Sequence, residues 1–303
     1  MSDHNISKRA LLALPSISVW TARRFDRQLS EEVAEKHDAD AVRLGRYNKC
    51  VIDVRDKSYV AITKVAGEAR RWHDAHTSPW AQDGARIMAT AMYPDYSQQM
   101  ENFRTDFEYK VATFMERYPV LKRNARHELN GAFHEEDYPE IADLYKKFAF
   151  GVSYLPVPTG GDFRVEDMSI EHVESIKESI EREISAAIKQ AERNRWERLF
   201  GVVQHIATKL AVAPVRGQRK KGESGIFRDS LIENLREACD TLPKLALSED
   251  VEFDMLVEEA RTKLAGLDPK ELRDNVAVRS EAARKAADIV RKMERYFAPQ
   301  EAS

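Results

Sequence analysis

The feature that most constrains the fold is a run of 42 residues, 169–210, which contains no proline and one glycine, Gly201. Apolar residues recur there every three or four positions, the spacing of one face of an α-helix. A helix of this length spans roughly 63 Å at 1.5 Å per residue. A lone helix is only marginally stable, so this one needs helical partners along most of its length, from the same chain or from another copy. The positions on that face are Ile170, Val173, Ile180, Ile184, Ala187, Ala191, Trp196, Leu199, Val203, Ile206 and Leu210.

Shorter helices are predicted on both sides of this run. Phe103, Phe107, Val111, Phe114 and Tyr118 step by three or four residues, and Pro119 follows them. Proline disfavours a helical conformation in the residue before it, so we expect this helix to end there and another to cover 120–133. The stretch 76–88, with its Ser-Pro and Asp-Gly turn signals, is predicted to be a loop.

Capping residues place further helix starts. Ser30 is the predicted N-cap of a short helix, and Ser248 that of a helix over 249–265. Asp268 followed by Pro269 predicts another start, because proline suits the first turn of a helix. The last predicted helix covers 276–297 and carries small alanines on its apolar side.

The segment 146–167 differs from the rest, since two prolines and three glycines stand there among apolar residues. We interpret it as a joint between helical blocks. The fold class is therefore predicted as mainly α: an elongated multi-helix bundle with one long helix and at most a small β element. That element would lie near 14–20 and 148–165. The expected domains are an N-terminal helical block, the Pro/Gly joint and a C-terminal bundle, with the bounds 1–145, 146–168 and 169–303.

Composition narrows the class of protein. The formal net charge is −3 and 33% of the residues are charged, which argues against a surface that coats nucleic acid throughout. Cys50 and Cys239 lie far apart and predict no disulfide framework. No apolar run approaches the roughly 18 residues of a membrane span. We therefore expect a cytoplasmic protein that does not enter a membrane.

Charge is nevertheless segregated along the chain. Residues 43–71 hold eight basic and three acidic residues, a net charge of +5, whereas 127–145 hold six acidic residues and no Lys or Arg. Cations interleaved with large aromatics are typical of surfaces that bind single-stranded nucleic acid. Patches of opposite sign can also meet between copies and steer a head-to-tail assembly. The candidate anion or nucleic-acid site consists of Arg70, Arg71, Trp72, Trp80, Arg86, Arg216, Arg219, Lys220 and Lys221.

Catalytic chemistry finds little support in the residue pattern. A zinc-protease helix needs two histidines four residues apart, but His127 is followed by Gly131 at that place. His134, two helical turns further on, leaves a weak metal candidate formed by His127 and His134. No nucleophile–base pair follows from the spacing, so we predict no catalytic residues and no cofactor.

Several stretches together resemble an uncharacterised helical protein family of phages and integrative mobile elements. The resemblance rests on ISVWTARR, FAFGVSYLPVPTGGDFRV, RWERLFGVVQHIATKL, IFRDSLIENLREACDTLPKLAL and LAGLDPKELRDNVAVRSEAARKAADIVRKM. Genes of that family often lie near those of MoxR-type AAA+ ATPases and von Willebrand factor A proteins. The resemblance implies an accessory or adaptor protein on mobile DNA, and it brings no functional residues with it.

Three functions follow as hypotheses. The first is a non-enzymatic helical scaffold or adaptor, a coiled-coil-like interaction protein that forms a homo-oligomer or serves an AAA+ ATPase partner. The second is an accessory factor of recombination or replication that binds single-stranded DNA through 43–86 and Arg216 to Lys221. The third is a metal-dependent enzyme that uses His127, His134 and nearby carboxylates.

Overall fold

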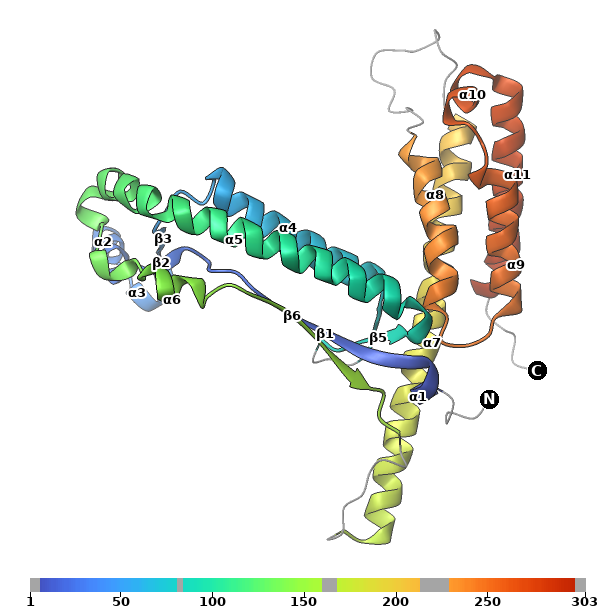
Figure 1. Cartoon of the computed structure of the whole chain (residues 1–303), viewed down its shortest axis with the longest axis horizontal. Helices are drawn as coiled ribbons and strands as arrows, with labels where there is room; N and C mark the ends of the chain where they lie inside the picture. Colours follow the sequence, from blue (N-terminus) through green and yellow to red (C-terminus); the bar gives the residue numbers. More distant parts are fainter. Residues whose placement is uncertain (1–5, 81–83, 160–167, 213–228, 298–303) are drawn as a thin grey trace. The chain divides into compact units, whose positions relative to one another are not determined.

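The structure is a computed structural model that describes residues 6–80, 84–159, 168–212 and 229–297. It is mainly α-helical with a small antiparallel sheet, as predicted (Figure 1). Candidate residues Arg216, Arg219, Lys220 and Lys221 lie outside the described residues.

The chain forms two compact units, and each is discontinuous in sequence. We call residues 14–75 and 95–153 the α4–α5 unit, and residues 1–13, 76–94 and 154–303 the bundle unit. These bounds differ from the predicted blocks, because strands β1 (Ala10–Ser18) and β6 (Ala149–Pro156) each contribute residues to both units.

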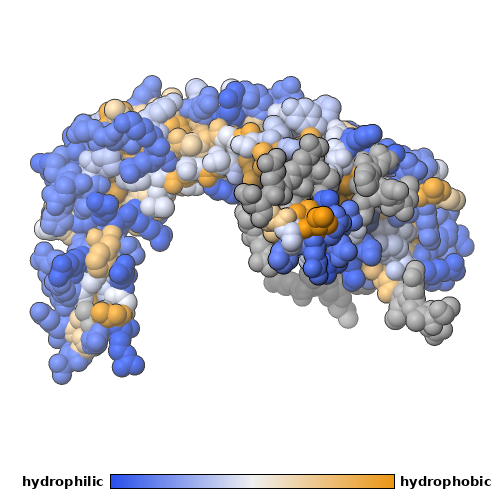
Figure 2. Space-filling model, turned by 90° about the horizontal axis from the view of Figure 1, so that it is seen from below, coloured by the Kyte–Doolittle hydropathy of each residue, from blue (hydrophilic) through white to orange (hydrophobic). Residues whose placement is uncertain are grey.

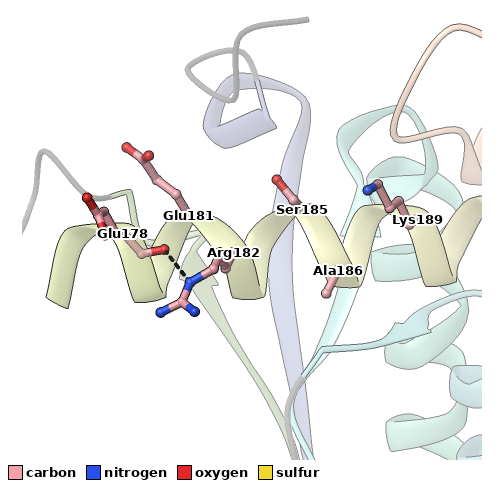
Figure 3. Close-up of a pocket in the computed structure, with 6 residues that line it drawn as sticks. All are labelled: Glu178, Glu181, Arg182, Ser185, Ala186 and Lys189. Atoms are coloured by element: carbon pink, nitrogen blue, oxygen red, sulfur yellow. Dashed lines mark hydrogen bonds between the residues drawn. The ribbon is translucent and has the colours of Figure 1, made fainter. Parts of the chain in front are cut away.

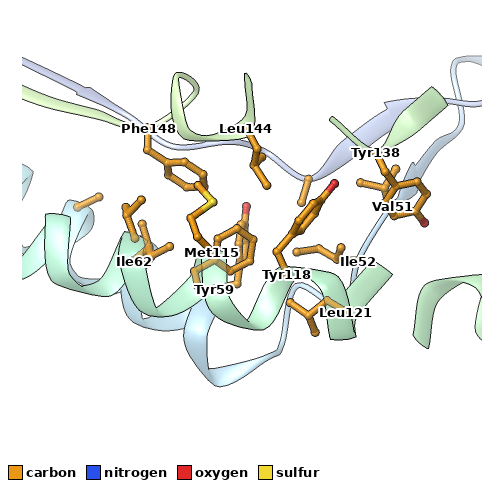
Figure 4. Packing of buried hydrophobic residues seen from close by; sticks show 14 of the residues in the cluster. Val51, Ile52, Tyr59, Ile62, Met115, Tyr118, Leu121, Tyr138, Leu144 and Phe148 are labelled. Atoms are coloured by element: carbon orange, nitrogen blue, oxygen red, sulfur yellow. The ribbon is translucent and has the colours of Figure 1, made fainter. Parts of the chain in front are cut away.

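Two long helices, α4 (Lys57–Ala75) and α5 (Tyr93–Leu129), lie side by side and form most of the α4–α5 unit (Figure 1). The predicted stripe of α5 is buried, with Phe107, Val111, Phe114 and Tyr118 at most 2% exposed. Side chains of α4, α5 and α6 (Ile141–Tyr145) turn toward one another in one apolar cluster (Figure 4). The helical pair is thus held together by the hydrophobic effect along its length.

The predicted end of α5 at Pro119 is wrong, because the helix continues through the proline to Leu129. Proline removes one helical hydrogen bond and its ring crowds the preceding turn. Leu121 and Ala125, in the next two turns, are buried in the same cluster as the residues before Pro119. Burial of this second stretch offsets the local cost of the proline.

A small lobe closes one end of the α4–α5 unit. It comprises β2 (Arg23–Phe25), α2 (Arg27–Lys36), α3 (Ala41–Leu44) and β3 (Asn48–Cys50), and β2 pairs with β3 in antiparallel register. The predicted cap Ser30 is wrong: Asp26 caps α2 by accepting from Leu29 N, and buried Ser30 lies inside the helix. The 3₁₀ turns Asn130–Ala132 and Glu135–Asp137 follow α5.

Lys49 fixes this lobe to the turns after α5. Its Nζ lies 3.2 Å from Asp26 Oδ2 and 2.9 Å from Asp137 Oδ2, and it donates to Ala132 O at 2.7 Å. The hydrogen bond from Leu29 N lowers the pKa of the Asp26 carboxyl; burial opposes this effect and Lys49 adds to the lowering. A buried cation that reaches three acceptors specifies a single position for the lobe.

The small sheet has the strand order β4-β5-β1-β6. The segment predicted as a loop over 76–88 contains β4 (Ser78–Pro79) and the start of β5 (Arg86–Ala89), so that prediction is wrong. Residues 10–13 of β1 pair with β5, which gives the short strand a buried partner. The predicted pairing between the N-terminal extended segment and 148–165 is confirmed, because β1 and β6 are neighbours in the sheet.

The bundle unit is built on α7 (Ile170–Val212), the predicted long helix. Its C-terminal part is covered by other helices (Figure 1). Asp268 and Pro269 begin α10 as predicted, whereas Asp250 and not Ser248 caps α9. The remaining elements are α1 (Ile6–Arg9), η2 (Thr90–Met92), α8 (Ser230–Thr241), η6 (Leu242–Leu245), α9 (Val251–Ala260), a π-helical turn (Arg261–Ala265), α10 (Pro269–Asp274) and α11 (Val276–Phe297).

A buried polar network crosses the middle of this bundle. Glu192 Oε1 accepts from Leu247 N and Ser248 N, both at 3.0 Å, and its other oxygen binds Arg195. Arg195, only 2% exposed, also donates to Leu242 O at 3.1 Å and lies 4.2 Å above the ring of Phe253. These contacts tie α7 to the chain before α9, so the network is structural.

Candidate functional site

The predicted cation–aromatic site divides between the two units. Arg70, Arg71 and Trp72 lie near the end of α4, whereas Trp80 and Arg86 belong to the bundle unit. Arg70 donates to Ile17 O at 2.8 Å, and the Trp72 ring packs against Tyr96 and Phe103 with centroids 5.4 and 6.4 Å away. Trp72 is therefore part of the packing of its unit, and its ring offers no open platform for a base.

In the bundle unit, Arg86 has a structural role. Its Nε donates to Thr77 Oγ1 at 2.6 Å and its NH2 to Thr77 O at 3.0 Å. Trp80 N donates to Ala85 O at 3.1 Å. These bonds join β4 and the residues beside it to β5.

Carboxylates compensate much of the basic stretch 43–71. Arg55 binds Asp53 at 2.9 Å, Lys64 lies 3.9 Å from Glu68, and Lys49 is held by two aspartates. Asp53 and Glu68 are already included in the net charge of +5, so only Asp26 and Asp137, which lie outside the stretch, lower the local charge further. A polyanion would meet a weaker field there than the count suggests.

The two histidines of the weak metal candidate do not share a helix face. His127 is exposed in the last turn of α5, which ends at Leu129, and Asn130 then adopts a positive φ of 47°. His134 follows in extended backbone before the next 3₁₀ turn. Within the described residues, no group of three His, Cys, Asp or Glu side chains is arranged to hold a metal ion.

Cys239 is unsuited to nucleophilic chemistry. It is fully buried on α8, where its Sγ contacts Val257 O at 3.8 Å. Burial raises the pKa of the thiol to about 11. A thiolate is the reactive form, so this cysteine is almost wholly unreactive at neutral pH.

We expect the two cysteines to react with a thiol reagent at very different rates. At about pH 8, Cys50, which is half-buried, should react first, while Cys239 should react only as the bundle opens. Absorbance of the released thiolate would measure both rates, and Cys50→Ser should remove the fast phase alone. A fast phase that survives in Cys50→Ser would show that Cys239 is accessible.

A hollow of about 700 Å³ lies beside the N-terminal half of α7 (Figure 3). The residues that line it are Glu178, Glu181, Arg182, Ser185, Ala186 and Lys189. All of them project from this single helix, and Arg182 Nε donates to the backbone oxygen of Glu178 at 3.3 Å. Since a small-molecule site needs polar groups that converge from several sides, this hollow does not resemble one.

The same part of α7 carries the more informative feature. Ile170, Val173, Ile176 and Ile180 follow one another at helical spacing, and we call them the α7 stripe. Ile170 is 83% exposed and the other three are half-buried. Burial on α7 begins only at Ile184, which is 2% exposed. The predicted apolar face is thus continuous, but only its C-terminal part is buried.

A second group of exposed apolar residues lies on the small lobe of the α4–α5 unit. On the face shown in Figure 2, most of the coloured residues are hydrophilic and the hydrophobic ones lie in separate areas. Only the short helix of the lobe was predictable from sequence, because the lobe's strands are three residues long and its apolar residues follow neither helical nor strand periodicity. The group comprises Phe25, Leu29, Val42, Leu44 and Tyr47.

Comparisons with protein-family models, with curated proteins and with solved structures give no match. The described helices include none that is both long enough and apolar enough to span a membrane. The two exposed apolar surfaces, the α7 stripe and the group on the small lobe, are the features that point to a function.

Proposed function

We propose that this chain is a non-enzymatic helical scaffold or adaptor that binds other protein chains through the α7 stripe. The observation that carries the proposal is the abrupt change in burial along one helix. Residues 170–183 contain no buried side chain, whereas the same face is buried from Ile184 to Leu210.

The length and composition of this segment suit a protein partner. Fourteen helical residues span about 21 Å, enough for the four apolar residues of the stripe to contact one partner helix. An amphipathic helix of this kind commonly docks in a groove or against another helix. A rigid arm continuous with a packed bundle is also preorganised, which lowers the entropic cost of association.

The proposal also covers the origin of the scaffold and the protein that it binds. The resemblance to helical proteins of phages and mobile elements supports an accessory role on mobile DNA inside a bacterial cell. It also supports an AAA+ ATPase as a partner besides a second copy of the chain. Single-stranded DNA is less well supported as a ligand, because Arg70 and Trp72 of the predicted cation–aromatic site are held by contacts within their own unit.

The proposal predicts that a polar stripe abolishes association without unfolding the protein. The variant Val173→Gln, Ile176→Gln, Ile180→Gln keeps good helix formers in place of residues that are not buried. Light scattering should show the wild type above monomer mass, or in complex with purified products of adjacent genes, and the variant as a free monomer. The free energy of unfolding should change by no more than about 0.5 kcal/mol per site.

Ile206→Gln provides the matched control, because Ile206 lies on the same face of the same helix but is fully buried. It should destabilise the bundle markedly while leaving the stripe intact. The scaffold proposal fails if the wild type is a strict monomer that binds none of these products. It also fails if the stripe variant is destabilised as much as Ile206→Gln, since the stripe would then be core.

A further inference from the structure

The exposed apolar residues of the small lobe are held by a folded frame. Phe25 pairs with Asn48 across the β2–β3 ribbon, and Asp26 N donates to Tyr47 O at 2.9 Å. Tyr47 N in turn donates to Ser30 Oγ at 3.2 Å. Val42 is 90% exposed and Phe25 44% exposed. A rigid surface that leaves five large apolar side chains uncovered is typical of a protein contact.

Arginines surround these apolar residues. Residues 23–25 and 41–50 contain Arg23, Arg24, Arg43, Arg46 and Lys49 and no acidic residue. Lys49 and Arg24 are bound to Asp137, and the Arg46 guanidinium lies 5.4 Å from the ring centre of Phe25. Across the described ranges, no carboxylate lies within 4.0 Å of a side-chain nitrogen of Arg23, Arg43 or Arg46.

Within the described lobe, none of the acids pairs directly with these three arginines, and all of those acids lie outside the β2–β3 ribbon. Glu31 is bound to Arg27 at 2.7 Å, Glu32 accepts from Gln28 at 2.9 Å, and Asp40 caps α3. Glu35 and Asp38 are exposed at the end of α2. The ribbon and α3 together form a cationic apolar surface, which we call the lobe surface: Arg23, Phe25, Arg43, Leu44, Arg46 and Tyr47.

The α7 stripe has the complementary character. Residues 170–183 hold five glutamates against Lys177 and Arg182, a net charge of −3. Two such stripes facing each other would bring like charges together, which disfavours a symmetric contact. An apolar surface edged by arginines would bury the apolar residues of the stripe and form ion pairs with its glutamates.

We propose that the lobe surface of one copy binds the α7 stripe of a second copy, an inference that rests on the scaffold function of the stripe. Because the two surfaces differ, the contact is heterologous: the first copy keeps its α7 stripe free and the second copy keeps its lobe surface free. Such contacts build closed rings or open filaments. A nucleic acid is the less suitable occupant, because Leu29, Val42 and Leu44 present aliphatic area that bases and phosphates would leave uncovered, whereas the isoleucines of the stripe would bury it.

Charge reversal on each side tests this contact. Arg43→Glu with Arg46→Glu alters the lobe surface, and Glu174→Arg with Glu178→Arg alters the edge of the stripe. Each double variant alone should associate at least tenfold more weakly than the wild type in analytical ultracentrifugation. All four residues are exposed, so circular dichroism should show unchanged helix content.

Complementation separates a direct contact from a general effect of charge. A mixture of the two double variants retains one native lobe surface and one native stripe, so it should form heterodimers. The chain that carries all four reversals should associate again. Lys57→Glu with Lys64→Glu, an equal charge change on exposed positions of α4, should leave association unchanged.

Three results would overturn the inference. If the lobe variant associates like the wild type while the polar stripe variant does not, the scaffold function stands and the lobe is not its partner. If neither variant alters association or partner binding, both proposals fall. If a fluorescent single-stranded oligonucleotide binds the wild type but not the lobe variant, and self-association is unchanged, the lobe surface is a nucleic-acid site.

Discussion

Replacing Glu192 by alanine should lower the free energy of unfolding of the bundle unit by about 3–5 kcal/mol. The change leaves buried Arg195 with only the exposed Asp254 carboxylate, 3.9 Å away, and it also removes the acceptor of Leu247 N and Ser248 N. A buried charge that loses its partner keeps its full desolvation penalty, whereas an exposed pair of the same geometry contributes little. Urea denaturation followed by Trp196 fluorescence would measure the loss.

Two further variants divide this effect into its parts. Glu192→Gln keeps an oxygen for the two backbone amides but removes the charge, so it should cost less than alanine. Glu192→Ala combined with Arg195→Met removes the orphaned cation, and it should be more stable than Glu192→Ala alone. A Glu192→Ala protein as stable as the wild type would show that water reaches Arg195, contrary to its burial.

Phe114→Ala should destabilise the α4–α5 unit by about 3–5 kcal/mol. Phe114 is fully buried, and its ring centre lies 5.7–6.4 Å from those of Phe148, Tyr59, Tyr118 and Trp20. Alanine would leave a cavity among rigid rings that cannot collapse into it. Hydrogen exchange measured by mass spectrometry should locate the loss of protection to α4 and α5.

Tyr109→Ala is the matched control for this cavity, since Tyr109 lies on the same helix but is 66% exposed. Its free energy of unfolding should change by about 0.5 kcal/mol or less. Equal effects of the two substitutions would mean that Phe114 is not part of a close-packed core.

The sequence predicted best where one helix face repeats over many turns. The long helix, the α5 stripe and the final helix are all present, because most of the apolar positions along them are buried against neighbouring elements; the α7 stripe at the start of the long helix is the exception. Asp268 and Pro269 begin α10 as expected, since capping is a local interaction.

Predictions that rested on a single residue were less reliable. Pro119 does not end α5, because burial of Leu121 and Ala125 outweighs a local preference. Ser30 does not cap α2, because Asp26, four residues earlier, takes that role. Strands β4 and β5 escaped the sequence analysis, since strands of two and four residues show no measurable alternation and depend on pairing with distant segments.

The candidate sites also differ in whether they follow from a periodic pattern or from contacts between distant residues. The apolar face of α7 was visible in the sequence, but where its burial stops depends on the lengths of α8, α9 and α11 beside it. The lobe surface could not be found from spacing, because the Phe25–Asn48 register and the Asp26–Tyr47 bond bring its residues together. Arg70 and Trp72, chosen for their residue types, prove to be held within their own unit.

The division of the chain into interleaved units has a consequence for synthesis on the ribosome. The α4–α5 unit is complete once residue 153 has emerged from the ribosome, before any of α7 emerges. Residues 10–13 and 76–94 belong to the bundle unit, so they can pack into it only after its helices have been synthesised. Domains generally fold as soon as their chain is available. We therefore expect the α4–α5 unit to fold first on the nascent chain and the bundle unit to fold after it.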